Sequence, residues 1–326
     1  REPFTLNFFF FLTGRSVVGN LEKMKNLILF LFLCVFLFKN SFSCLNGETK
    51  VLKDGTFLYE DFEGNVPHGH FFYKDELEAG AKRLDSLYQL TKDLDYLSDK
   101  GLIFILLQKY DEAIKIFLEI EKIQPNRYST ASNLGTAYEL IGQNENALKW
   151  ISKSVEIDPK SHKNSEWIHV KILEAKIKGE QFYTTKFLLD SDFGNDTIPI
   201  SDISNENLQM LSDALYFQLN ERISFVKPKD KIVAQLLYDL GNIAFLLGNY
   251  YDAREDYIMA KEYGYSSHII EIRAKKIEQK IEKSQSSKKS IAKKSVHKKE
   301  VYILASVILV ILVIIFIRRK KLKSNR

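Results

Sequence analysis

The chain has 326 residues and a formal net charge of +5, with 23 Phe, 16 Tyr and only 6 Pro. Residues 44–270 carry 25 basic and 36 acidic residues, whereas residues 271–299 carry 11 basic and 3 acidic residues. The positive charge therefore surrounds one apolar segment near the C-terminus, and the acidic body is not expected to bind nucleic acid.

The N-terminal residues predict an export signal. Residues 1–23 precede the first methionine, Met24, and we interpret them as upstream translation that is not native to the protein. Residues 24–43 have a basic start, an apolar run at Leu27–Phe38 and small residues before Cys44, which is typical of a cleaved signal peptide. An uncleaved membrane helix and lipidation of Cys44 are the alternatives. With at most Cys44 left after cleavage, no internal disulfide and no thiolate metal site are expected.

Residues 44–73 predict an extended segment with one hairpin. The runs 50–52 and 56–59 flank Asp54-Gly55, a pair that favours a type I′ turn. His68 and His70 follow Pro67. A metal site would need a third ligand at a recognisable spacing, so we interpret these two histidines as surface loop residues.

A helix is expected over residues 74–90, because its apolar residues recur at helical spacing. They are Leu77, Ala81, Leu84, Leu87 and Leu90. This helix can cover the first of the repeats that follow.

Residues 94–127 and 128–161 form a tandem repeat. Three pairs of anchors are each separated by 34 residues, namely Gly101 and Gly135, Ala113 and Ala147, and Pro125 and Pro159. Small residues suit the close crossing of two antiparallel helices, and proline ends each second helix. A period of 34 is typical of a helix–turn–helix repeat.

This pattern resembles the tetratricopeptide repeat family. Tyr138 stands at the family's usual aromatic position, while Leu97 and Ala131 replace its early tryptophan. A third copy is expected over residues 234–267, where Gly241 and Ala253 keep the same spacing of 12. The resemblance predicts an all-α fold, a right-handed α-solenoid of the tetratricopeptide type, over residues 74–270.

The residues between the second and third copies predict degenerate units. Helices are expected over residues 166–177 and 206–220, with a loop around residues 190–196. His169 replaces the family's close-crossing glycine, which puts tight crossing there in doubt. The acidic loop lacks the order of ligands of a calcium loop. Because no catalytic, cofactor-binding or metal motif is present, we expect no enzyme activity and no cofactor.

The resemblance also predicts which residues line a concave peptide-binding groove. They are Asp95, Ser98, Leu102, Ile105, Ser132, Thr136, Glu139, Tyr238, Asn242 and Phe245. Members that clamp a C-terminal carboxylate have basic residues where this chain has Ser98, Ser132 and Tyr238. We therefore expect a protein or peptide partner with an apolar or basic segment.

The C-terminal residues predict a membrane anchor. Residues 271–299 are expected to form a charged, exposed stem and then a Lys/Ser-rich tether that can contact anionic lipid. Val301–Ile317 is an uninterrupted apolar run that predicts a transmembrane helix, followed by a basic cytoplasmic tail at residues 318–326. Together with the signal peptide, this order predicts a single-pass inner-membrane protein of a bacterium with its repeats in the periplasm.

The leading hypothesis is a non-catalytic, membrane-anchored scaffold for protein–protein interactions in the cell envelope. Two alternatives stay open at this point. One is a sensory or regulatory membrane protein that passes a signal through a partner, and the other is an accessory factor of an envelope enzyme complex.

Overall fold

The computed structural model of the protein describes residues 49–61 and 64–286, all within one compact unit, Gly47–Arg326. The predicted signal peptide, both cysteines, the tether beyond residue 286, the Val301–Ile317 span and the basic tail lie outside these residues. Among the residues that are described, no helix has both the length and the apolar character needed to cross a membrane.

A small antiparallel sheet precedes the helices, in the order β1 (Thr49–Val51), β2 (Phe57–Glu60) and β3 (Phe71–Phe72). The predicted hairpin is present, but its turn is not type I′, because Gly55 has a positive φ of 86° and Asp54 does not. Gly55 donates its N–H to the Leu52 carbonyl, and the Asp54 carboxylate accepts hydrogen bonds from Thr56. A wider turn with one left-handed glycine therefore replaces the expected two-residue turn.

Helix α2 (Leu77–Thr91) forms as predicted and buries Leu77, Ala81 and Leu84 against the hairpin residue Leu58. Leu90 does not join this face and is 82% exposed. The reason is local, because α2 ends one residue later at Thr91, and the next residue, Lys92, has a left-handed conformation.

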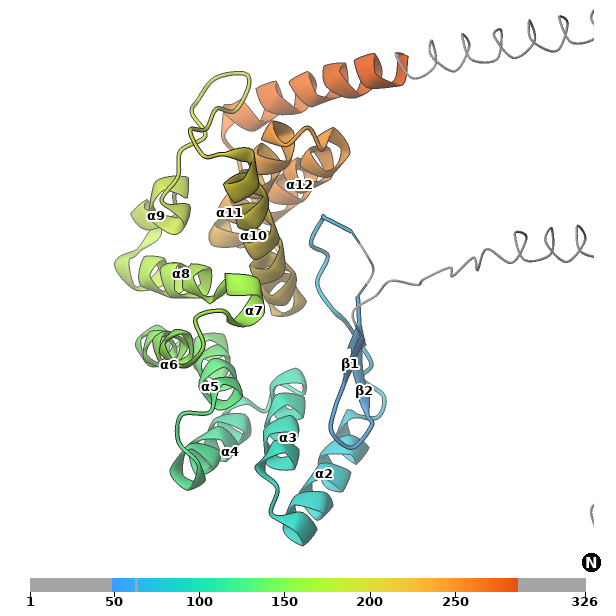
Figure 1. Ribbon diagram of the computed structural model, residues 1–326, viewed down its shortest axis with the longest axis vertical. Coiled ribbons are helices and arrows are strands. Elements are labelled where there is room, and N and C mark those ends of the chain that lie inside the picture. The colour runs from blue at the N-terminus through green and yellow to red at the C-terminus, as the bar shows by residue number, and fades with distance from the viewer. Residues whose placement is uncertain (1–48, 62–63, 287–326) are drawn as a thin grey trace, which may run out of the picture. The chain divides into compact units, whose positions relative to one another are not determined.

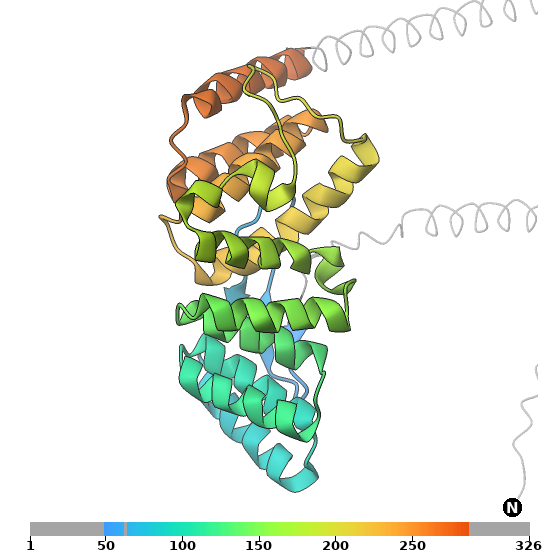
Figure 2. The ribbon, with the colours of Figure 1, turned by 90° about the vertical axis from the view of Figure 1, so that its left-hand side faces the viewer.

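The two predicted repeats are helical hairpins. They consist of α3 (Leu94–Leu106) with α4 (Tyr110–Ile123), and α5 (Tyr128–Leu140) with α6 (Asn144–Ile157). Each second helix ends two residues before its proline, Pro125 or Pro159. Figure 2 shows these helices as successive layers.

Close crossing at glycine holds each hairpin together. A Cβ atom on Gly101 would lie 2.7 Å from the Phe117 ring, and one on Gly135 would lie 2.5 Å from the Ile151 side chain. The pair α11 (Lys231–Leu246) and α12 (Tyr250–Tyr263) repeats this contact between Gly241 and Tyr257, at 2.5 Å. These distances leave no room for a side chain, which explains why the glycines recur at this period.

The elements between the second and third hairpins are irregular. They are α7 (Ser161–Asn164), α8 (Glu166–Lys178), the short 3-10 helix η1 (Glu180–Phe182), α9 (Thr185–Leu189) and α10 (Asn205–Phe225). Helix α10 continues five residues beyond the predicted end at residue 220. Where the repeat pattern would place a long partner for α8, only η1 and α9 are present, so this unit is truncated.

A last helix begins at His268 and continues to residue 286, the end of the described chain (Figure 1). We expected an exposed stem from residue 271, and this is wrong for one face of the helix. Ile270, Arg273, Ile277 and Ile281 are all buried, and the three isoleucines belong to the core cluster that includes α11 and α12. The helix has an apolar stripe at helical spacing and covers the third hairpin.

Candidate peptide-binding cleft

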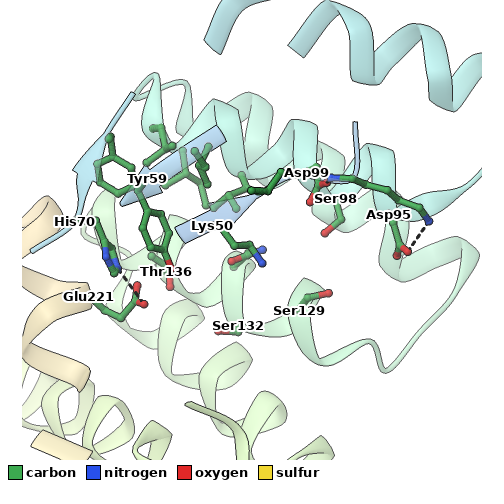
Figure 3. Close-up of a pocket in the computed structure, with 18 of the residues that line it drawn as sticks. Lys50, Tyr59, His70, Asp95, Ser98, Asp99, Ser129, Ser132, Thr136 and Glu221 are labelled. Carbon is green, nitrogen blue, oxygen red and sulfur yellow. Dashed lines mark hydrogen bonds and ion pairs between the residues drawn. The ribbon is translucent and has the colours of Figure 1, made fainter. Parts of the chain in front are cut away.

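A cleft of about 610 Å³ lies between the β1–β2 hairpin and the first helices of the two repeats (Figure 3). Lys50 and Tyr59 project from the strand side, and Ser98, Ser132 and Thr136 line the helix side. This volume is in the range of clefts that bind small molecules or short peptide segments.

The helix side of the cleft is built by the repeat itself. Ser98 and Ser132 are 34 residues apart, as are Leu102 and Thr136, and as are Asp99 and Asn133. Equivalent positions on α3 and α5 therefore present side chains side by side. Hydroxyl and amide groups dominate this wall, so it can donate and accept hydrogen bonds to a peptide backbone.

The hairpin is fixed to α3 by charged contacts at one end of the cleft. The Lys53 ammonium contacts Asp93 and lies 2.9 Å from Asp95, and the Lys53 backbone N–H donates to Asp99 at 2.7 Å. Hydrogen bonds from Lys53 and Arg127 lower the pKa of Asp95. Burial raises the pKa of Asp99, although the backbone hydrogen bond from Lys53 favours its charged form. Asp95 is therefore already paired within the chain.

At the other end of the cleft, His70 holds the strand side in place. We expected this histidine in a surface loop, but its side chain is buried. Its side chain is 5% exposed, its Nδ1 lies 2.8 Å from Asp61, and its Nε2 lies 3.1 Å from Glu221 of α10. The ring stacks on Tyr59 with centroids 4.0 Å apart. Burial opposes the charged ring, but Glu221 and Asp61 outweigh it and raise the pKa of His70. His68, by contrast, is exposed.

A second cavity of about 240 Å³ shares Ser132, Thr136 and His162 with the first and contains a buried charged cluster. Its centre is Glu139, whose carboxylate accepts two hydrogen bonds from Arg222, at 2.7 and 3.2 Å. Lys176 and His169 also contact Glu139, at 2.6 and 2.7 Å. The cluster joins α5, α8 and α10.

The cluster keeps its carboxylates ionised. Burial disfavours the charged form of Glu139, but Arg222 and His169 outweigh burial and hold its pKa well below the usual range. Glu166, which contacts His162 at 2.6 Å, likewise has a lowered pKa despite its burial. Burial opposes protonation of His169, yet Glu139 and Glu166 raise its pKa. His169 therefore replaces the family's glycine with a charged contact between repeats.

The structure brings most of the predicted groove residues together. Those that line the larger cleft are Asp95, Ser98, Leu102, Ile105, Ser132 and Thr136, and Glu139 lines the smaller cavity. Tyr238, Asn242 and Phe245 are not placed there and are 5%, 0% and 5% exposed. Arg273 of the last helix donates to Tyr238 Oη and Asn242 Oδ1, so the chain itself occupies this part of the third hairpin.

The strand wall was not foreseen from the sequence. Lys50, Tyr59, His70 and Phe72 come from the N-terminal segment, and Glu221 comes from α10. The hairpin was predicted, but nothing in its residue pattern indicates which helices it faces. Asp61, nine residues before His70, was the one local signal that this histidine has an acidic partner.

Comparison with known proteins agrees with the repeat assignment. The tetratricopeptide repeat family model matches residues 94–127 and 129–161, and it does not include the third hairpin. The chain therefore carries two tetratricopeptide repeats within a larger helical solenoid, and such repeats act as scaffolds for protein interactions. No curated protein matches the chain.

Several solved structures are distantly similar. A MamA double mutant from RS-1 shares 14% identity over 58% of this chain and 86% of its own, with a TM-score of 0.33. A tetratricopeptide repeat protein from Parabacteroides merdae shares 14% over 63% and 93%, with a TM-score of 0.31. The TPR2AB domain of yeast Sti1, in complex with pHSP90, shares 14% over 65% and 80%, with a TM-score of 0.29. At these TM-scores the likeness adds no argument.

Proposed function

We propose that the protein is a non-catalytic scaffold that binds an extended segment of a partner protein in the cleft between the β1–β2 hairpin and helices α3 and α5. The observation that carries this proposal is the row of equivalent side chains on α3 and α5. This row faces the β1–β2 hairpin, and the cleft between them has a volume of about 610 Å³. Repeat scaffolds bind partners through such arrays of equivalent positions.

The composition of the cleft favours a segment with apolar and hydrogen-bonding groups over one with a free carboxylate. Of the three lysine and arginine side chains that line the cleft, Lys53 and Arg127 already contact Asp95, and the charge of Lys50 acts on the nearby Asp99 carboxylate. Tyr59, Phe72 and Phe225 supply apolar surface at the other end. A partner segment would gain backbone hydrogen bonds from the serines and burial of an apolar side chain from these aromatics.

We also propose that the scaffold is anchored in a membrane by Val301–Ile317 and that its repeats work in the periplasm. Support comes from the sequence, in which the apolar run is flanked by Lys299 and Arg318 and is preceded by a segment typical of an export signal. Protease added to intact spheroplasts should digest the repeats. Digestion only after lysis would contradict this topology.

Site-specific cross-linking tests the cleft as the binding surface. A photoreactive amino acid replaces Ser129, which is exposed at the cleft, and in a matched protein it replaces Lys115, which is exposed on α4 and does not line the cleft. The proposal predicts a discrete cross-linked partner from position 129 and none from position 115. A synthetic peptide that covers the cross-linked segment should then compete. Equal cross-linking at both positions, or no competition, would refute the assignment.

A further inference from the structure

The third hairpin contains an acidic residue where the other two contain large apolar ones. Counting three residues on from the buried alanines Ala113, Ala147 and Ala253 gives Ile116, Trp150 and Asp256. This position lies on the second helix of each hairpin, where Ile116 and Asp256 are buried and Trp150 is half-buried. The exchange of an isoleucine or tryptophan for aspartate is costly in a helical core and calls for a reason.

Asp256 is buried without a partner. Its exposed fraction is 0%, and within residues 49–61 and 64–286 neither carboxylate oxygen has a hydrogen-bond donor. Burial raises its pKa well above the usual range, and the nearby acids Asp252 and Glu255 raise it further. An isoleucine at this position would pack at least as well and would avoid the cost of burying an unpaired carboxyl group.

Asp256 lies at a separate cleft of about 490 Å³ between α10, α11 and α12. Polar groups dominate its lining, including Gln209, Ser212 and Asp213 of α10, Asn249, Asp252, and Asn65 of the N-terminal segment. Two of these acids have partners, because Asn65 donates to Asp252 at 3.0 Å and Gln209 donates to Asp213 at 2.8 Å. Of the acids that line this cleft in the described chain, Asp256 alone lacks a donor.

We propose that this cleft binds an organic cation, a primary ammonium or guanidinium group, which inserts between α10 and α12 and donates hydrogen bonds to Asp256. A charge-assisted pair of this kind satisfies both carboxylate oxygens at once. A metal ion fits less well, since no group of three or more His, Cys, Asp or Glu side chains in the described residues is arranged to hold one.

The charges that face Asp256 set the expected pH dependence. Asp252 and Glu255 on α12 and Asp213 on α10 favour a cation, whereas Lys163 of α7 opposes it. Helix α11 contributes only the uncharged Leu240 and Ala244 to the lining. The Lys163 ammonium lies 5.9 Å from the Phe217 ring. Because burial raises the pKa of Asp256, a proton competes with the cation for this carboxyl group, and affinity should rise with pH.

The test is equilibrium dialysis of the full chain against two probes, agmatine and the peptide acetyl-Gly-Lys-Gly-amide, with acetyl-Gly-Gly-Gly-amide as the uncharged control. We expect saturable binding of one equivalent of a cationic probe, no binding of the control, and proton release in calorimetry with two buffers. Tighter binding of the peptide would assign the cation to a partner protein, and tighter binding of agmatine would assign it to a small amine.

Two aspartate variants separate the site from a structural effect. Asp256→Asn keeps the shape and should weaken binding by at least about tenfold. Asp239→Asn is the matched control, because Asp239 is also buried with a raised pKa, of about 7, but bonds to Thr185 and does not line the cleft. Absence of saturable binding up to about 10 mM would refute the site. Equal affinity in Asp256→Asn, or binding without proton release in the native chain, would also refute it.

Discussion

At the residue scale, the repeat is specified by glycine positions at which the facing helix leaves no space for a side chain. Gly101, Gly135 and Gly241 each sit 16 residues before the residue that they touch, which is Phe117, Ile151 or Tyr257. The sequence predicts these contacts because spacing and residue type agree. Asp256 is different, since an isolated acid carries no signal of what will surround it, and for His70 the one local signal is Asp61, nine residues earlier.

Gly135→Ala tests the close crossing. The added Cβ would lie 2.5 Å from Ile151 Cδ1 and 3.1 Å from the Ile151 backbone nitrogen, so the helices must separate. We expect a loss of about 1–3 kcal/mol in the free energy of unfolding, measured by urea titration. Gly64→Ala is the control, because a Cβ there meets nothing closer than 4.0 Å. Equal stability of Gly135→Ala and the native chain would contradict the crossing.

His169 predicts a pH dependence of stability. Its pKa is raised in the folded state by Glu139 and Glu166, against the effect of burial. A raised histidine pKa stabilises the fold fully below the unfolded value of about 6.5, and this contribution is lost as pH rises through the folded pKa. The stability difference between the native chain and His169→Asn should therefore shrink as pH rises from 6 upward. His268→Asn, at an exposed histidine, should follow the native chain at every pH.

Removal of Glu139 tests the same cluster by another route. Glu139→Ala leaves Arg222 and Lys176 without their shared carboxylate in a buried site. Loss of one partner of a buried ion pair typically costs about 3–5 kcal/mol, and we expect a decrease of this size in urea unfolding. Glu78→Ala is the control, because Glu78 pairs with Lys109 at the surface. A cost no larger than that of the control would show that the cluster does not join the repeats.

At the element scale, the regular hairpins and the leading helix α2 are predictable, whereas the packing of the last helix is not. The 34-residue period defines α3–α6, and the same glycine and alanine spacing identifies α11 and α12. The last helix was expected to be an exposed stem because its sequence is rich in charge. Its stripe of Ile270, Ile277 and Ile281 is the signal that it packs, and the buried Arg273 hides that signal in any count of charged residues.

Arg273 links the last helix to the loop after α9. Its guanidinium donates to the carbonyls of Phe193, Gly194 and Asp196, as well as to Tyr238 and Asn242. We expect Arg273→Leu to cost about 2–4 kcal/mol in unfolding, because several buried acceptors lose their donor. Hydrogen exchange at residues 193–196 should become faster. Arg254→Leu, at a surface pair with Glu255, should change neither quantity. Unchanged exchange in Arg273→Leu would contradict the link.

At the scale of the whole molecule, the third hairpin differs in use from the first two. The groove positions of the first two repeats line a cleft, whereas the equivalent Tyr238 and Asn242 accept hydrogen bonds from Arg273 of the last helix, and Phe245 is buried in the core. A family pattern can place ten groove positions, but it cannot show that three of them are buried and that two of these, Tyr238 and Asn242, bond to the last helix. That outcome depends on contacts between residues more than 30 positions apart, which no local periodicity encodes.

The cleft between the strands and the two repeats is the central claim, and hydrogen exchange of the full chain tests it most directly. The measurement compares the free chain with the chain bound to the peptide identified by cross-linking at position 129. Binding in the cleft should slow exchange in β1, α3 and α5 and leave α12 unchanged. Slowing confined to α4, α6 or α12, with none in α3 and α5, would contradict the proposed site.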